Sequence, residues 1–533
     1  MGHSEEQRPC DRQLAGGGRF AVWVLVLLSV YAAGLTHGLS SPWTGMHDWN
    51  GAFFSQLGRN LLRYPLNVHH GMGVVAVGDA VPPPEERSIY AAHPPGLVWM
   101  VAGSFSVLGE SERSARLVAI GSSLGALILL VWLVRVGWGG EAAVLAGLLY
   151  SVLPMSVYFG RMVDHEAVCL LCMLGAIAAW QVVARTNCAP RRRTLAWGCW
   201  SVAIVAGIWL DWSAVLFSGL FCLHAIWRAS RQRKGCREVA YVLIVSAVGL
   251  AGMLIYLVYS GLDGRWGDLA AIFFSRAGEV EGAIRRDLSA QGGAWDYTRE
   301  NLTWPVLVLA LWGVFTRFLH TKRKETAGIR LDGAWLLPVT GLLWLALFWR
   351  QYERHNYWMF YLGPMAAVLA SLGLLALRES LSRVGIVFAR GAWYVIAGVV
   401  VAVCLVQTDD YFARQSYPLE EVAALREINA TTDPTERVLL YEESVLVEQR
   451  GGYRFRNIVP PQRAYYLDRA FGVEREVGAV INRASDYAMF VIPVADALRL
   501  GSALDELHAG HPPVQAGRLL VFDLRSGRGG EGG

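Results

Sequence analysis

The organisation of this chain starts from Ser41-Pro42-Trp43-Thr44-Gly45-Met46-His47-Asp48-Trp49-Asn50, which directly follows an apolar run over residues 20–39. A run of about 20 apolar residues is long enough for a helix to cross a bilayer. The stretch therefore places one carboxylate, Asp48, just beyond the end of a predicted membrane span, where a membrane-embedded substrate would meet water. We hypothesise that Asp48 is a catalytic base and that the other spans build a site around it.

The composition predicts a polytopic α-helical membrane protein. The chain has 533 residues, of which 54% are hydrophobic and only 17% are charged, whereas soluble domains carry about 25% charged residues. Further apolar runs of spanning length lie at 239–262 and 391–408. The first run has no small-residue cleavage site and is followed by more spans, so we interpret it as a membrane anchor and not as a secretory signal.

The distribution of positive charge predicts the topology. The run Gly96–Leu108 is too short for an ordinary span, so we interpret it as a juxtamembrane or re-entrant helix. With that choice, all four basic clusters fall on one side, which the positive-inside rule makes the cytoplasm; they lie at 185–193, 228–237, 317–324 and 378–390. About 11 spans follow, with the amino terminus inside and the carboxyl terminus outside, at residues 20–40, 113–135, 141–159, 166–184, 195–210, 212–227, 239–260, 303–316, 333–349, 357–377 and 391–408.

The chain divides into three predicted parts. Residues 1–19 form a polar cytoplasmic tail, and residues 20–408 form the membrane domain with a long external loop at 41–112. Residues 409–533 alternate short apolar runs with helix-like segments, one of them over Val494–His508, which predicts a small extracytoplasmic α/β domain. Its Gly-rich end, 525–533, has the composition of a disordered tail.

The predicted external face gathers the ionisable residues that are candidates for chemistry. Charged groups in or near a membrane are costly and therefore suggest function. The candidates are His47, Asp48, His93, Arg116, Arg161, Asp164, His165, Glu166, Asp211, Arg354, His355 and Tyr357.

Each candidate also has a structural interpretation. Asp164 and Glu166 suit the first turn of a helix, where carboxylates cap amide groups and favour the dipole. Arg116 and Arg161 could bind a lipid phosphate, because a guanidinium binds phosphate through two hydrogen bonds. Alternatively, their side chains could simply extend to the membrane interface, as long cationic side chains do. Tyr357 also suits an aromatic belt.

A divalent metal is the one cofactor that these residues suggest. Asp164, His165 and Glu166 offer oxygen and nitrogen ligands, and His93 or His47 could complete the set. The sequence shows no tight ligand spacing, so the metal stays undetermined.

The ordered set of motifs resembles a known family. The chain is similar to the integral-membrane glycosyltransferases of the protein O-mannosyltransferase and lipid A aminoarabinose transferase group, in the C-type glycosyltransferase superfamily. The resemblance covers about residues 20–380 and rests on four motifs, which are His47-Asp48, His93-Pro94-Pro95-Gly96, Gly109-Glu110-Ser111-Glu112-Arg113-Ser114-Ala115-Arg116-Leu117 and Gly160-Arg161-Met162-Val163-Asp164.

The resemblance implies a polyprenyl-phosphate sugar donor and an inverting transfer on the extracytoplasmic face of the inner or plasma membrane. It implies that Asp48 is the base, that Arg116 helps to place the donor phosphate, and that Asp164 is a second acidic site residue. We expect Arg161 and His93 to contact the donor phosphate together with Arg116. Two positions depart from the family: Trp49 follows Asp48 where a second acid is frequent, and His93 stands where some members have lysine.

We therefore predict a glycosyltransferase that moves a hexose or pentose from a polyprenyl-phosphate donor to the hydroxyl of a lipid, glycan or protein acceptor. No nucleic-acid partner is expected. A transporter or flippase is one alternative, but it predicts mid-span charges and internal symmetry that the sequence does not display. A non-catalytic assembly subunit is the second. The sugar, the acceptor and the oligomeric state stay open.

Overall fold

The computed structural model describes most of the chain. The described residues are 17–81, 88–185, 189–233, 235–262, 293–321, 332–349, 352, 355–383, 385–441, 460–469, 471–474 and 477–525. Most of the predicted cytoplasmic tail, the Pro82-Pro83-Pro84 segment, Arg354 and the Gly-rich end lie outside these ranges.

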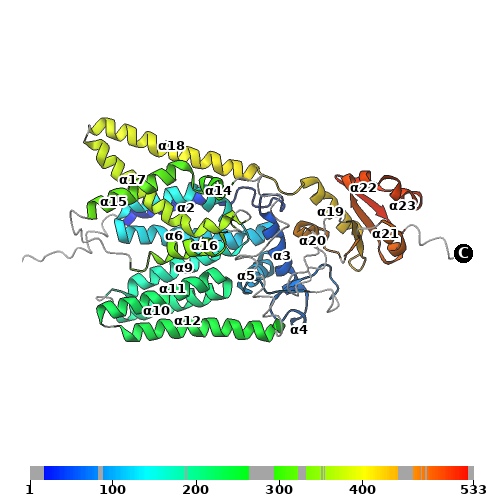
Figure 1. Cartoon of the computed structure of the whole chain (residues 1–533), viewed down its shortest axis with the longest axis horizontal. Coiled ribbons are helices and arrows are strands. Elements are labelled where there is room, and N and C mark those ends of the chain that lie inside the picture. The colour runs from blue at the N-terminus through cyan, green and yellow to red at the C-terminus, as the bar shows by residue number, and fades with distance from the viewer. Residues whose placement is uncertain are drawn as a thin grey trace, which may run out of the picture.

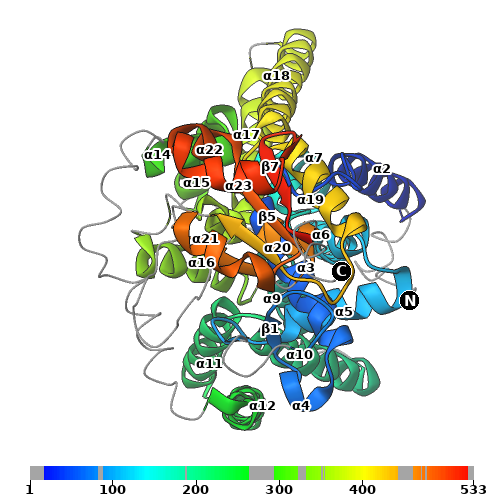
Figure 2. The ribbon, with the colours of Figure 1, turned by 90° about the vertical axis from the view of Figure 1, so that its right-hand side faces the viewer.

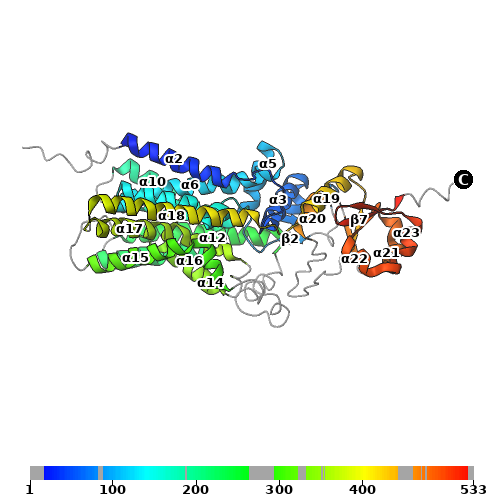
Figure 3. The ribbon, with the colours of Figure 1, turned by 90° about the horizontal axis from the view of Figure 1, so that it is seen from above.

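A bundle of long apolar helices forms the membrane domain, as the composition predicted (Figure 1). Eight helical segments of the described chain are long and apolar enough to cross a membrane. They comprise α2 (Gly17–Leu35), α6 (Glu112–Trp138), α9 (His165–Val183), α10 (Pro190–Leu210), α11 (Trp212–Gln232), α12 (Cys236–Leu257), the segment of η4 (Asn356–Leu362) and α17 (Gly363–Ser382), and α18 (Ile386–Ala413). The helices lie side by side along the long axis (Figure 3).

The other predicted spans correspond to shorter helices. Residues 141–159 form α7 (Gly140–Val152) and α8 (Pro154–Phe159), which are separate because Pro154 has no N–H to continue α7. The remaining two are α15 (Trp304–Thr321) and α16 (Leu336–Leu347), whose apolar parts are shorter than 18 residues. The total of about 11 spans therefore stays a prediction.

The described parts of the basic clusters at 185–193, 228–237 and 378–390 lie at the end of the bundle opposite to α3 (Asp48–Arg63) (Figure 1). Arg191 begins α10, Arg231 ends α11 and Arg378 lies in the last part of α17. Because these helices alternate in direction, their other ends meet at the end where α3 lies. The described part of the fold thus separates the basic clusters from the predicted site residues.

Helix α5 (Gly96–Leu108) begins and ends at the same end of the bundle. Just before it, His93 contacts Asp211 at the junction of α10 and α11. Just after it, Glu110 pairs with Arg59 of α3. A helix with both ends on one side of the membrane does not cross it, which agrees with the predicted juxtamembrane or re-entrant helix.

The long loop after α2 folds against the membrane domain around α3. It also contains the short helix α4 (Leu66–His69) and an antiparallel pair of strands, β1 (Gly73–Val75) and β2 (Ser88–Tyr90). The buried amide of Asn60 donates to the carbonyls of Val74 and Ala76, which fixes this pair on α3. These contacts hold the last part of α3, whose first residue is Asp48.

The C-terminal region is an α/β unit beyond that end of the bundle (Figure 1), and it lies in front of the bundle when the molecule is viewed along its long axis (Figure 2). Its five-stranded sheet has the order β4-β3-β5-β7-β6, in which β3 is parallel to β4 and β5, and β7 is antiparallel to β5 and β6. The strands are β3 (Val438–Tyr441), β4 (Phe471–Glu474), β5 (Met489–Pro493), β6 (Val514–Ala516) and β7 (Leu519–Asp523). The helices of this region are α19 (Leu419–Thr431), α20 (Pro461–Leu467), α21 (Val477–Arg483), α22 (Val494–Leu500) and α23 (Asp505–Gly510). One further helix, α14 (Ala294–Leu302), belongs to the membrane domain and precedes α15.

The predicted single helix over Val494–His508 is interrupted. It ends at Leu500, and a short 3-10 turn over Gly501–Leu504 precedes α23. Gly501 has a φ of +52°, a conformation that glycine adopts without steric cost. Gly501 therefore divides into two helices a segment that the apolar pattern predicted as one.

Candidate functional site

Asp48 is the first residue of α3 and directly follows a tight turn. His47 before it adopts a left-handed conformation with a φ of 62°, which ends the loop from α2 and starts the helix. The Gly45 N–H donates to Asp48 Oδ2 at 2.8 Å. The Asp48 side chain keeps 20% of its surface exposed, so the carboxylate is held but not sealed from a substrate.

Two buried arginines flank this carboxylate. Arg116 donates to the carbonyls of Leu39 and Ser41 at 3.0 and 2.5 Å, and its second terminal nitrogen lies 3.4 Å from Asp48 Oδ2. Arg161 donates to the carbonyls of His37 and Gly38. Both guanidinium groups thus hold the loop between α2 and α3 and bring positive charge to Asp48.

Asp48, Arg116 and Arg161 line one cavity of about 170 Å³. Its other walls come from the loop between His37 and Met46, from Tyr158 and Met162, and from Phe412 and Gln415. The cavity therefore joins residues from the start, the middle and the last membrane helix of the chain. A larger cavity of about 680 Å³ lies at the basic end of the bundle, lined by Arg378, Arg383 and Arg390, away from Asp48.

The electrostatics of the Asp48 cavity favour an anion. The pKa of Arg161 is lowered to about 10, first because burial disfavours its charge and then because Arg116 repels it, although Asp48 acts in the opposite direction. Two guanidinium groups against one carboxylate leave a net positive charge in a largely buried place. A bound anion would offset this cost.

Asp164 belongs to a second group of contacts. It caps α9: its Oδ1 accepts from the backbone N–H and the ring Nδ1 of His165, both at 2.8 Å. Its Oδ2 accepts from Asn50 Nδ2 at 2.6 Å. The predicted capping role is therefore present, and Asn50, two residues after Asp48 on α3, connects Asp164 to the helix that begins at Asp48.

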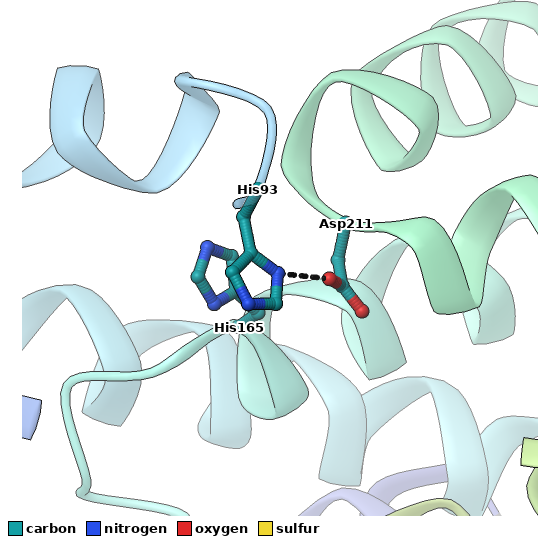
Figure 4. Close-up of side chains that lie close together, drawn as sticks. All are labelled: His93, His165 and Asp211. Atoms are coloured by element: carbon teal, nitrogen blue, oxygen red, sulfur yellow. Dashed lines mark hydrogen bonds and ion pairs between the residues drawn. The ribbon is translucent and has the colours of Figure 1, made fainter. Parts of the chain in front are cut away.

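His93, His165 and Asp211 come together from three separate segments (Figure 4). The His93 ring stacks on that of His165 at 4.4 Å between centroids, and His93 Nδ1 lies 2.7 Å from Asp211 Oδ1. Burial raises the pKa of Asp211, but the hydrogen bond from His93 and the nearby charges of His93 and His165 outweigh it and hold that pKa well below its usual range. These residues offer two nitrogens and one oxygen to a metal ion.

The other predicted residues lie around these two groups. His47 Nε2 donates to Asn356 Oδ1 at 3.0 Å, and its ring packs against that of Tyr357. His355 contacts the Tyr357 hydroxyl and stacks on Trp358. Glu166 is buried beside His165, and its Oε2 has no hydrogen-bond partner among the described residues. Arg354 lies outside the described residues.

The predicted residues therefore do not form one cluster. Asp48, Arg116 and Arg161 share a cavity, whereas His93, predicted to contact the donor phosphate, lies with His165 and Asp211. Of the predicted metal ligands, His165 belongs to the ligand group, Asp164 supports it through the His165 ring, and Glu166 is not part of it.

Three residues in or near the site were not singled out from the sequence. The Tyr158 hydroxyl donates to the Met46 carbonyl at 2.7 Å and lines the Asp48 cavity. Trp43 packs against the Arg116 guanidinium at 4.1 Å from its ring centroid, and Asn50 connects α3 to Asp164. Trp43 and Asn50 belong to the opening motif and Tyr158 precedes Gly160-Arg161, so position within a motif was the available signal.

Comparisons with known proteins agree with this architecture. Residues 92–259 match the sequence model of a family described as dolichyl-phosphate-mannose-protein mannosyltransferase. No curated protein matches the chain at the level of sequence.

Two solved structures share the fold over nearly the whole chain. The structure of ArnT from Cupriavidus metallidurans bound to undecaprenyl phosphate is 12% identical, with a TM-score of 0.62, and the match covers 95% of this chain and 98% of that chain. The archaeal oligosaccharyltransferase AglB from Archaeoglobus fulgidus, in complex with an inhibitory peptide and a dolichol-phosphate, is 12% identical with a TM-score of 0.54, and the match covers 92% and 72%. The chain is therefore a polytopic membrane protein that shares its fold with these two solved structures, and its residues 92–259 match the dolichyl-phosphate-mannose-protein mannosyltransferase family.

Proposed function

We propose that this protein transfers a sugar from a polyprenyl-phosphate donor to an acceptor hydroxyl, at the end of the bundle where α3 lies. The observation that carries the proposal is the cavity that Asp48 shares with Arg116 and Arg161. A carboxylate beside an anion-binding pair of arginines supplies both a base and a place for a phosphate. The ArnT structure was solved with undecaprenyl phosphate, which supports a lipid phosphate as the ligand.

The proposed reaction uses these charges in one displacement. The acceptor oxygen attacks the anomeric carbon as the bond from that carbon to the phosphate oxygen breaks, and the lipid phosphate leaves with the electron pair. Asp48 takes the proton of the hydroxyl, and the two arginines stabilise the charge that grows on the phosphate. Both described contacts of Asp48 involve Oδ2, and Oδ1 is the oxygen proposed to receive the proton.

The proposed location is the extracytoplasmic face of the inner or plasma membrane. The basic clusters lie at the opposite end of the bundle, and such clusters favour the cytoplasmic side. The C-terminal α/β region lies beyond the end of the bundle that carries α3 (Figure 1), so we propose that it contributes to binding of a lipid, glycan or protein acceptor.

Transfer assays with Asp48→Asn test the base. Purified protein in lipid would receive radiolabelled polyprenyl-phosphate sugars and a membrane extract that supplies acceptors. Asparagine keeps an oxygen to accept from Gly45 N–H, but it cannot take a proton. We expect transfer to fall by about 10²–10⁴-fold, the usual contribution of a general base, while binding of the lipid phosphate persists. Full activity of Asp48→Asn would contradict the proposed base. Asp496→Asn, at a partly exposed position on α22, serves as a control.

Arg116→Lys tests the phosphate site. Lysine cannot make the two carbonyl contacts and also face Asp48, so we expect transfer to drop at least tenfold with weaker binding of polyprenyl phosphate. Arg135→Lys is the matched control, because Arg135 is on the same helix and packs over Phe20 in a similar way. Lipid-phosphate binding without transfer from any donor would instead favour an assembly subunit.

A further inference from the structure

We propose that His93, His165 and Asp211 form a zinc site that ties three segments of the membrane domain together. His93 lies in the segment before α5, His165 is the first residue of α9, and Asp211 separates α10 from α11 (Figure 4). One ligand atom from each residue lies within 4.8 Å of the other two. The proposal concerns metal binding and stands apart from glycosyl transfer.

The donor set matches the preferences of zinc. Two imidazole nitrogens and one carboxylate oxygen, with a fourth position left for water or another ligand, are a common zinc environment. His93 Nδ1 and Asp211 Oδ1 are 2.7 Å apart, and two ligand atoms of a tetrahedral zinc ion with bonds of about 2.0 Å lie about 3.3 Å apart. A small movement would therefore admit the ion, and the proton on His93 Nδ1 would move to the other ring nitrogen.

A buried nitrogen points independently to a missing ligand. His165 is only 2% exposed, and its Nε2 has no hydrogen-bond partner among the described residues. A buried polar atom without a partner is unfavourable, because it has lost its hydrogen bonds to water and gained none within the protein. A zinc ion bound to this nitrogen removes that cost.

The neighbouring contacts prepare His165 as a ligand. Asp164 Oδ1 accepts from His165 Nδ1 at 2.8 Å, so the proton of the neutral ring is on Nδ1 and the lone pair is on Nε2. A carboxylate that orients a histidine through its second nitrogen is a frequent companion of metal sites. The other Asp164 oxygen accepts from Asn50 on α3, so the metal site is connected to the helix that begins at Asp48.

Metal analysis of the full-length protein tests the proposal. The protein in lipid would be incubated with zinc chloride, desalted and analysed for zinc and iron. We expect about one zinc per chain, and at least a tenfold lower zinc content in both His165→Gln and Asp211→Asn. In cobalt-loaded protein we expect the visible bands of tetrahedral cobalt without the charge-transfer band of a thiolate, which excludes the cysteines as ligands.

His224→Gln is the matched control. His224 is also buried, and its Nε2 lies 3.0 Å from Asp332 Oδ1 at the basic end of the bundle, but it is not part of the ligand group. This variant should keep its zinc. Less than about one zinc per ten chains in the unmodified protein, iron in place of zinc, or unchanged zinc in His165→Gln would each overturn the site. Because zinc content needs no sugar donor, these results are independent of whether Asp48 supports transfer.

Discussion

At the scale of single residues, His47 shows how burial sets a protonation state near Asp48. Burial lowers the pKa of His47 from 6.5 to about 4, more strongly than its bond to Asn356 and the charges of Asp164 and Asp48 raise it. The ring is therefore neutral at pH 7. Its Nε2–H donates to Asn356 Oδ1, and this hydrogen bond requires an N–H donor at position 47 but no positive charge.

This shift predicts a loss of stability in acid. The unfolded chain takes up the proton at a pKa near 6.5 and the folded chain only near 4, so the stability is complete above about pH 6.5 and is lost as the pH falls to about 4. The loss should approach ~3 kcal/mol. Thermal unfolding in detergent at about pH 7 and about pH 4 would measure it. His47→Gln, which keeps a donor, should unfold at more similar temperatures at the two pH values than the unmodified protein.

The exposed His508→Gln is the control for this comparison. It should show the same acid sensitivity as the unmodified protein. Equal acid sensitivity in His47→Gln would mean that other groups account for the whole effect.

At the scale of elements, α20 joins the C-terminal region to α3 and α6. The Trp43 N–H donates to the Tyr466 hydroxyl at 2.6 Å, and this hydroxyl donates to Glu112 at 3.0 Å. Arg63 makes two hydrogen bonds to Asp468, at 2.8 and 2.7 Å. Because Trp43 also packs on Arg116, the C-terminal region is in contact with the loop that shapes the Asp48 cavity.

A double-mutant cycle on Arg63 and Asp468 tests this contact. Both side chains are mostly buried, and we expect a coupling energy of about 1–3 kcal/mol in thermal unfolding. Asp468→Asn should destabilise more than Arg63→Gln, because Asp468 also pairs with the buried Arg59 at 3.1 Å. Asparagine suits the left-handed conformation at this position.

The pair Arg499–Asp496 in the same region, whose side chains are more exposed than those of Arg63 and Asp468, supplies the control. Its coupling should be below about 0.5 kcal/mol. A coupling of that size between Arg63 and Asp468 would show that the contact contributes little to the position of the C-terminal region.

At the scale of the whole molecule, the separation of charge along the bundle predicts its orientation in the membrane. Ser106 is exposed on α5 at the site end, and Ser230 is exposed near the end of α11 in a basic cluster. In a background without the natural cysteines, a membrane-impermeant maleimide applied outside intact cells should label Ser106→Cys. Ser230→Cys should react only after permeabilisation. The reverse pattern would place the proposed site in the cytoplasm.

The sequence alone determined the class of the protein and the positions of most helices along the chain. Apolar runs of bilayer length are a local property, and the cost of exposing backbone polar groups in lipid leaves helices as the available solution for such runs. The shortness of Gly96–Leu108 likewise predicted a helix that does not cross. The order of the four motifs was enough to suggest the family, because motif order is a property of the linear sequence and needs no knowledge of the fold.

Only the tertiary structure decided which candidates meet. Asp48, Arg116 and Arg161 are far apart in the sequence and share a cavity because the loop between α2 and α3 is held by both arginines. His93 was expected with the donor phosphate, yet the fold brings it to Asp211 and His165. Such contacts depend on how helix ends pack against one another, and the spacing of residues within one segment carries no information about that packing.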